Sequence, residues 1–288
     1  DEGTPEKLRS AIVAHYHVLE KGLAMPERKS IFGVSVARSL IGKLHTWSMR
    51  GYQDNRQISA ARSVLAAYAG AVDYNSGRAI PDLHAFVAWQ AEGRSNCGGT
   101  RRVRKEDFLT GARGDYARLV EVRRSVRDYA DIEVPGSVIR NAIQIAQQSP
   151  SVCNRQSGGV FWTTNREKID AIMRLQNGNR GFGHLAKGLL IVTSDLSVFH
   201  DTHERNQSWV DGGLFSMSLL YALSYLGLGA CPLNWCVDNK QDLRLRSLTN
   251  IPNNHRVIMM ISIGWLKDEF DVAVSERNDV SEAMWEIA

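Results

Sequence analysis

The hydrophobic pattern of this chain changes once, at a glycine- and arginine-rich stretch that runs from Gly93 to Asp107. Upstream of this stretch, apolar residues recur at helical spacing and no strand pattern is present. Downstream of it, from Tyr116 onward, segments with helical spacing alternate with short apolar runs typical of strands. We therefore expect a helical N-terminal extension over residues 1–92, a linker over 93–107 and a separate mixed domain over 108–288.

The extension is expected to contain four helices. Pro5 suits the first position of a helix that Gly22 would close, and Asp54 is the expected cap of the third helix. The large apolar residues Trp47 and Tyr68 belong to faces that a small bundle would bury. The expected helical spans are 5–22, 36–51, 55–77 and 81–92.

In the second region the alternation of helices and strands predicts a sheet with helices packed on it, in an α/β or α+β fold. The segment from Leu214 to Leu226 is apolar on nearly every face, so it is expected to be a central and fully enclosed helix. Pro135 is expected to open another helix. The expected helices are 115–122, 136–146, 168–175 and 214–226, and the expected strands are 159–164, 188–193 and 256–265.

Composition excludes several classes of protein. The 288 residues are 43% hydrophobic and 23% charged, as in soluble globular proteins. A net charge of +4 is too weak to indicate a nucleic-acid partner, and no apolar run is long enough to predict a membrane span. Four cysteines in a chain of this length do not suggest a disulfide framework. A cytoplasmic location is the default expectation.

Three kinds of site have only weak support in the sequence: a dinucleotide site, a metal site and a reactive cysteine. Gly181 to Ala186 matches the dinucleotide-binding pattern G-x-G-x-x-A, but the strand follows the glycines instead of preceding them, so we expect a turn. The polar cluster from His200 to Glu204 and the pair Cys231 and Cys236 lack zinc-site spacing, and no metal is expected. Cys153 lies in a polar loop near arginines that could activate its thiol, and a packing role is the favoured alternative.

Two short stretches carry the strongest functional signal. The segment 122–129 reads Val-Arg-Arg-Ser-Val-Arg-Asp-Tyr, and its guanidinium groups match the geometry of phosphate oxygens. One helix downstream, the segment 149–156 reads Ser-Pro-Ser-Val-Cys-Asn-Arg-Gln. Together they resemble the nitroreductase family of FMN enzymes, in which an Arg-Arg-Ser-x-Arg-x-aromatic segment and a helix precede a Pro-Ser-x-x-Asn-x-Gln loop.

The resemblance covers about Tyr116 to the C-terminus, and it implies an α+β fold, a homodimer and FMN at the subunit interface. Two further features match the family pattern. They are the segment 227–235, which in the family leads backbone groups past the flavin ring, and the basic position near residue 277. The implied phosphate and ribityl contacts are Arg123, Arg124, Ser125, Arg127, Ser275 and Arg277. The implied ring contacts are Pro150, Ser151, Val152, Asn154 and Gln156 of the loop, from the partner subunit, and Pro232, Leu233 and Asn234.

The implied activity is the transfer of hydride from NAD(P)H through FMN to a nitroaromatic, quinone or other conjugated small-molecule acceptor. The flavin supplies the chemistry, so no protein acid or base is assigned, and Arg127 is the candidate donor that raises the flavin potential. A specialised biosynthetic or dehalogenating flavoenzyme and a non-enzymatic flavin-binding regulatory module are the alternatives.

The chain also departs from the family pattern. Gln156 is followed by Ser157 and Gly158 instead of Pro and Trp, and Cys153 and Arg155 replace smaller residues at positions expected to face the flavin ring or its entrance. The helical extension is an addition. It could form a lid over the flavin, although an ordinary polar end of the first helix is the favoured interpretation of His15, His17, Glu20 and Lys21.

Overall fold

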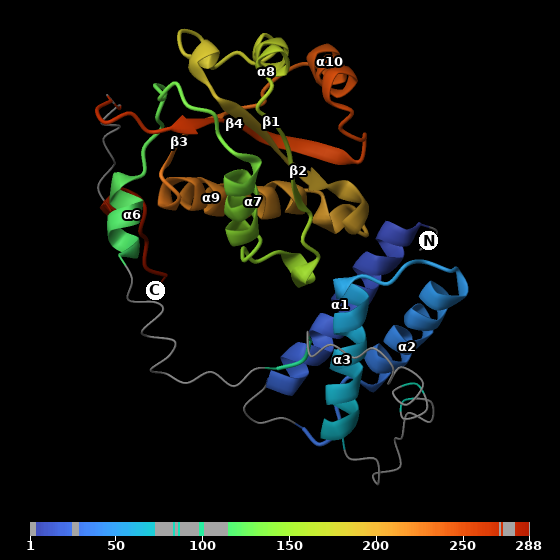
Figure 1. The fold of residues 1–288 in the computed structure, drawn as a ribbon. Coiled ribbons are helices and arrows are strands. Elements are labelled where there is room, and N and C mark those ends of the chain that lie inside the picture. Colours follow the sequence, from blue (N-terminus) through green and yellow to red (C-terminus); the bar gives the residue numbers. More distant parts are fainter. Residues whose placement is uncertain are drawn as a thin grey trace.

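The structure is a computed structural model of the chain. It describes residues 4–24, 29–72, 83, 86, 98–100, 115–270, 272 and 280–287. In this part of the chain a mixed α+β domain follows a bundle of helices, as Figure 1 shows. The α+β fold class predicted from the sequence is confirmed.

The domain is built on one antiparallel sheet of four strands in the order β1-β2-β4-β3. The strands are β1 (Gly158–Thr163), β2 (Gly188–Asp195), β3 (Leu228–Leu233) and β4 (His255–Trp265). β4 is the longest and pairs with both β2 and β3, while β1 and β3 form the edges. Three of these strands lie where the sequence predicts them, and β3 was not expected as a strand because Gly229 and Pro232 weaken its β pattern.

Helices cover both faces of the sheet. α8 (Arg166–Met173) and α10 (Asn239–Thr249) lie on one face, and α7 (Gly136–Ala146) and α9 (Gln207–Tyr225) lie on the other, as Figure 1 shows. The alternation of β2 explains this arrangement, since Leu189 and Ile191 pack with α8 and α10 while Leu190 and Val192 pack with α7 and α9. The sheet is therefore buried on both faces, which accounts for the unbroken apolar run of β2.

α9 lies along the sheet but is not enclosed on every side, so the expectation of a fully enclosed helix is wrong for the single chain. Phe215, Leu219 and Leu223 are buried against the sheet. On the opposite side Leu214 is 43% exposed and Tyr225 is 73% exposed. The short helix α6 (Tyr116–Val122) contacts the C-terminal end of α9, where the rings of Tyr116 and Tyr221 meet edge to face.

The extension forms its own hydrophobic core. α1 (Pro5–Ala24), α2 (Val34–Met49) and α3 (Arg56–Ala71) bury their apolar faces together with Leu83 and Phe86. The cap of α3 is Asn55, whose side chain accepts from the backbone N–H groups of Gln57 and Ile58. The predicted cap, Asp54, instead pairs with Arg62, and α3 ends at Ala71 rather than at Gly77.

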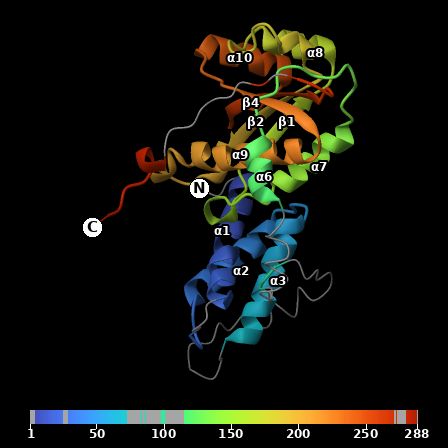
Figure 2. The same cartoon turned by 90° about the vertical axis from the view of Figure 1, so that its left-hand side faces the viewer.

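α1 packs against the mixed domain. It packs against two short 3-10 helices, η2 (Val152–Asn154) and η4 (Leu196–Val198), and it lies below α9 in the view of Figure 2. The remaining 3-10 segments are η3 (Gly183–Leu185), η5 (Thr202–Glu204) and η6 (Val280–Glu282). Among the described residues, no helix is long and apolar enough to cross a membrane.

Candidate functional site

The arginine-rich segment lies beside the edge strand β3. Val126 N–H donates to the carbonyl of Ala230 at 3.0 Å, and Ser125 pairs with Ala230 in a parallel bridge. A side chain at Gly229 would place its Cβ 2.8 Å from Cγ1 of Val126, so this close approach requires glycine. The bridge places Ser125 beside Ala230, and two of the predicted flavin-binding segments are therefore neighbours.

Among the residues that the structure describes, the arginines of this segment have no acidic partners. Arg124 donates to the backbone carbonyl groups of Glu121 and Arg123, and Arg127 donates to the carbonyl of Ser125 at 3.2 Å. For the Arg123 guanidinium no partner is found in the part of the chain that the structure describes. Three cations without a carboxylate partner, held within five residues, create a local positive potential that favours a bound anion.

Arg123 and Arg124 line a cavity of about 480 Å³ between α6, α9 and the end of β4. Its lining combines apolar residues with three arginines and one acid, Glu121, which suits a ligand with an anionic group. The residues around it are Arg118, Glu121, Val122, Arg123, Arg124, Val126, Ser224, Leu228, Leu266, Phe270 and Val272.

Arg127 lies on the other side of the segment, with its guanidinium carbon 5.7 Å from the centre of the Phe182 ring. Burial raises the pKa of the nearby Cys231 thiol, while the charge of Arg127 and a hydrogen bond with Ser125 act in the opposite direction. Burial also raises the pKa of Tyr129, whose hydroxyl group donates to the carbonyl of Val126 at 2.8 Å. These groups are neutral at physiological pH, so Arg127 keeps its full charge for a ligand.

The predicted ring contacts of β3 continue from this segment. Pro232 is partly exposed, Leu233 is buried and Asn234 is exposed. The carbonyl of Asn234 accepts from Gln176 Nε2 at 2.9 Å, which fixes the backbone where the strand ends. β3 therefore presents partly accessible backbone beside the arginines.

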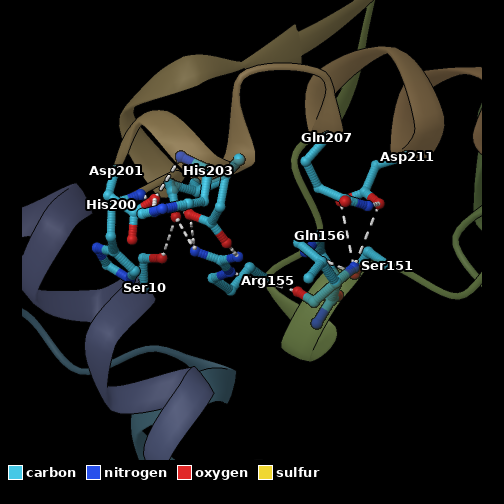
Figure 3. Close-up of polar contacts among 12 residues, drawn as sticks. Ser10, Ser151, Arg155, Gln156, His200, Asp201, His203, Gln207 and Asp211 are labelled. Atoms are coloured by element: carbon cyan, nitrogen blue, oxygen red, sulfur yellow. Dashed lines mark hydrogen bonds and ion pairs between the residues drawn. The ribbon is translucent and has the colours of Figure 1, made fainter.

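The second predicted segment, the loop 149–156, is held by α9. Val152 N–H donates to both carboxylate oxygens of the buried Asp211, each at 3.2 Å, and Gln207 Nε2 donates to the same carboxylate at 2.8 Å. Figure 3 shows Asp211 and Gln207 of α9 directed at this loop, close to Ser151 and Gln156. The Ser151 hydroxyl accepts from the Gln156 N–H at 2.9 Å.

The loop has an uncommon backbone conformation. Cys153, Asn154 and Gln156 have φ values of 48°, 55° and 53°, in the left-handed region that side chains disfavour. Such conformations cost free energy and persist only where the surrounding contacts fix them, so they often mark functional segments. Cys153 is exposed, as the resemblance implies for a residue at the entrance of a site.

Arg155 is expected to face the flavin ring or its entrance, but its side chain is buried in the protein, where it helps to fix the loop. Its side chain is only 2% exposed and forms a two-pronged ion pair with Glu204 of η5. Its remaining donors reach the carbonyl groups of Val198 at 2.9 Å and of Val152 at 3.3 Å, and its guanidinium lies over the Phe199 ring. The hydrogen bonds from Arg155 hold the pKa of Glu204 below its ordinary value.

The extension contacts the same structure. The Ser10 hydroxyl of α1 donates to the Val198 carbonyl at 2.8 Å, and Figure 3 shows Ser10 and Arg155 approaching this region from opposite sides. Ser157, which follows the loop, is buried and accepts a hydrogen bond from Ser194 rather than facing a ligand. We refer to Ser10, Arg155, Val198 and Glu204 as the loop clamp.

The two groups of predicted site residues are not brought together within one chain. The loop is bonded to Asp211 of α9, whereas Arg123 shares its cavity with Ser224 of the same helix. These two positions are separated by about 20 Å of helix axis at 1.5 Å per residue. Ser275 and Arg277 lie outside the described residues.

Sequence reasoning missed the loop clamp and Asp211. A lone serine on a helix and an arginine in a loop carry no pattern, and their partners are distant in sequence. The glycines near Gly181 form the expected turn, closed by hydrogen bonds to the carbonyl of Asn179. Within the described ranges, no group of three or more His, Cys, Asp or Glu residues could hold a metal ion.

Comparison with known proteins identifies the class. Residues 167–265 match the model of the nitroreductase family. A protein of Archaeoglobus fulgidus, provisionally named NADH dehydrogenase/NAD(P)H nitroreductase, is 26% identical over 158 residues, covering 54% of this chain and 87% of the relative. A protein of Methanothermobacter thermautotrophicus with the same name is 28% identical over 160 residues, covering 52% of this chain and 77% of the relative.

Solved structures agree on the fold. A provisionally named nitroreductase of Desulfovibrio desulfuricans, in complex with FMN, superposes with a TM-score of 0.53 at 19% identity, covering 61% of this chain and 98% of its own. A provisionally named nitroreductase of Bacillus subtilis superposes with a TM-score of 0.53 at 17% identity. The match covers 60% of this chain and 99% of the Bacillus chain. The fold and the arginine cluster define an α+β protein with a cationic sheet edge. Over this domain the family model and the relatives both support the nitroreductase family, as the sequence predicts.

Proposed function

We propose that the protein is an FMN-dependent oxidoreductase, and the observation that carries the proposal is the arginine cluster beside β3. Arg123, Arg124 and Arg127 have no carboxylate partner among the described residues, and a flavin phosphate would supply the missing negative charge. FMN, when bound, would accept a hydride from a reduced nicotinamide and pass it to an acceptor. The match to the nitroreductase family supports the same cofactor.

The chain's own residues would bind and orient the cofactor. Arg123 and Arg124 would hold the phosphate, and the Ser125 hydroxyl group would add a hydrogen bond. Arg127 would lie toward the ring, where a fixed positive charge stabilises the reduced and anionic form of a flavin. Partly accessible backbone at Pro232 and Asn234 would run beside the ring, and Ser275 and Arg277 would add phosphate contacts.

We further propose a homodimer in which each flavin is bound by both subunits. The loop 149–156 and the arginine segment form half-sites about 20 Å apart in one chain, so two chains are needed to complete one site. Exposed apolar residues on α9 supply a surface for pairing, because a monomer rarely leaves such a face uncovered. They are Trp209, Val210, Leu214 and Tyr225. We expect Leu214→Glu to shift the chain from dimer to monomer in sedimentation experiments, with loss of FMN.

NAD(P)H is the proposed electron donor, in keeping with the names of the Archaeoglobus and Methanothermobacter relatives. The proposed acceptor is a nitroaromatic, a quinone or another conjugated small molecule. A further relative, which matches over a shorter segment, is a 4-nitrobenzoate reductase of Nocardioides. It is 37% identical over 59 residues, which cover 19% of this chain and 24% of the relative.

A specialised flavoenzyme is a second candidate, because α1 packs on the loop that we place beside the flavin. We propose that residues 1–92 form a separate domain, joined through residues 93–107 to the FMN-binding domain over 108–288. The helical core of the extension supports this division, because it contains no residue of the sheet domain.

Steady-state turnover with NADH and NADPH, against a panel of nitroaromatics and quinones, tests the proposal. A general reductase is expected to reduce several acceptors at similar rates, and a specialist is expected to reduce them poorly. A flavin-loaded protein that no nicotinamide donor reduces would contradict the proposed oxidoreductase and favour a non-enzymatic flavin-binding module.

A further inference from the structure

A cavity of about 200 Å³ lies at the junction between the extension and the mixed domain. α1 contributes Arg9, Ser10 and Val13, and α3 contributes Gln57. The opposite wall includes Ser149, Pro150, Ser151 and Gln156, which belong to the loop proposed to contact flavin. The site therefore exists only where the extension meets the domain, and the family domain alone does not form it.

The size of the cavity selects a small ligand. A cavity of about 150 Å³ lined by apolar groups is large enough for benzene. Sites for drug-sized ligands start at about 300 Å³. A volume of about 200 Å³ thus suits one ring with a small substituent.

Part of the lining is apolar and flat. Val13 and Phe215 are almost fully buried, and Pro150 and Val198 complete this part of the wall. An added Cβ at Gly158 would lie 2.8 Å from Cγ of the Phe215 ring, so β1 passes this ring closely only because residue 158 is glycine. An aromatic ring would pack on such a surface.

The polar part of the lining offers donors. Within the described part of the chain, neither the Arg9 guanidinium nor the Gln147 amide has a hydrogen-bond partner. Gln57 uses its amide oxygen to accept from the Tyr16 hydroxyl, which leaves its amide N–H groups for a ligand. The other cation in the wall, Arg155, is neutralised by Glu204.

The one acid in the wall does not neutralise Arg9. The carboxylate of Asp211 already accepts from Val152 N–H and from Gln207 Nε2. The free groups of the cavity are therefore a guanidinium and amide donors, which together recognise a carboxylate.

We propose that this junction cavity binds a single-ring organic carboxylate, and that the acceptor of the reaction is such a compound whose ring also carries the group to be reduced, a nitro group or a quinone. The ring lies against Phe215 and Val13, and the carboxylate pairs with Arg9. Its identification as the acceptor rests on the proposed function. The binding of the carboxylate itself does not, because the cavity walls belong to the protein alone.

Calorimetric titration of the full-length protein, with its FMN as purified, tests the site with benzoate and with benzamide, its neutral analogue of the same shape. We expect benzoate to bind about tenfold more tightly than benzamide, because only benzoate forms a charged pair with Arg9. In Arg9→Gln this preference is expected to disappear. Gln147→Trp, at the exposed rim, is expected to block both compounds.

Arg140→Gln is the matched control, since Arg140 is an exposed arginine of α7 that lines none of the cavities described above. It is expected to bind both compounds as the unmodified protein does. Equal affinity for benzoate and benzamide, an unchanged benzoate affinity in Arg9→Gln, or no benzoate binding would overturn the cavity proposal.

The acceptor role has its own measurement. Benzoate is expected to inhibit quinone reduction competitively in the unmodified protein and about tenfold more weakly in Arg9→Gln. If a reduced nicotinamide reduces the flavin normally but benzoate does not bind, the cavity proposal is contradicted and the proposed function is not. Benzoate binding by a protein that holds no FMN, or whose FMN no nicotinamide reduces, contradicts the proposed function while the carboxylate site stands.

Discussion

Ser10 and Arg155 donate to one acceptor, the carbonyl oxygen of Val198, at 2.8 Å and 2.9 Å. Ser10 belongs to the helical extension and Arg155 to the loop proposed to contact flavin, so a single backbone group joins the two. The side chains of both residues are buried, and the surrounding water cannot replace either bond. Displacement of α1 is thereby linked to the conformation of the loop.

Ser10→Ala is expected to lower the free energy of unfolding by about 1 kcal/mol, the usual net value of one intramolecular hydrogen bond. Hydrogen exchange measured by mass spectrometry should show faster exchange in the loop 149–156. Ser63→Ala is the matched control, because the Ser63 hydroxyl bonds within α3 to the carbonyl of Ser59. Exchange in the loop that is the same in both variants would show that Ser10 does not restrain it.

Removing Glu204 should cost more stability than removing Arg155. Glu204→Gln leaves the Arg155 charge buried without its partner, and the loss expected for such a change is about 3–5 kcal/mol. Arg155→Met leaves a carboxylate that is 21% exposed and that water can reach, so the loss should be smaller. Chemical denaturation measures both. Asp170→Asn breaks the exposed Arg166–Asp170 pair and should change stability by less than about 1 kcal/mol. A smaller loss for Glu204→Gln than for Arg155→Met would contradict the arrangement.

The clamp should also weaken in acid. The pKa of Glu204 is lower in the folded chain than its ordinary value of 4.5, chiefly because Arg155 bonds to the ionised form. The unfolded chain therefore binds this proton first as the pH falls, and folding loses stability. The contribution is complete above pH 4.5 and disappears as the pH falls through the lower folded pKa. The stability difference between the unmodified protein and Glu204→Gln should shrink over that interval, and a difference independent of pH would contradict the assignment.

Much of the fold could be predicted from the sequence because its signals are local. Proline marks the starts of α1 and α7, and apolar runs mark β2 and β4. β3 was missed, since a strand containing Gly229 and Pro232 depends on its neighbours rather than on its own propensity. The exposed side of α9 was missed because the sequence pattern does not distinguish apolar residues that a helix buries from apolar residues that it leaves exposed.

The candidate site was predicted only where residues act in short segments. The arginine segment and the loop could be found because their residues are adjacent in sequence. The contacts that join them to the rest of the molecule, such as Ser10 with Val198 or Arg155 with Glu204, link residues far apart in the chain. Only the folded structure shows that Arg155 is buried and pairs with Glu204.

Arg123→Gln is expected to weaken FMN binding by about one to two decades, the cost of one charge-assisted contact to a phosphate. Equilibrium dialysis of the protein against FMN measures the change. Arg140→Gln removes the same charge from an exposed position outside the arginine cluster and should leave the affinity unchanged. Equal FMN affinity in the unmodified protein and Arg123→Gln would remove Arg123 from the phosphate site.

The visible absorption spectrum of the purified protein, recorded without oxygen before and after addition of NADH or NADPH, tests the central claim most directly. The bands of oxidised flavin should be present at first, fade when the reduced nicotinamide is added, and return when a quinone is supplied. The flavin released on denaturation should be FMN. A protein that carries no flavin after incubation with FMN, or whose flavin bands neither nicotinamide changes, would contradict the assignment as an FMN-dependent oxidoreductase.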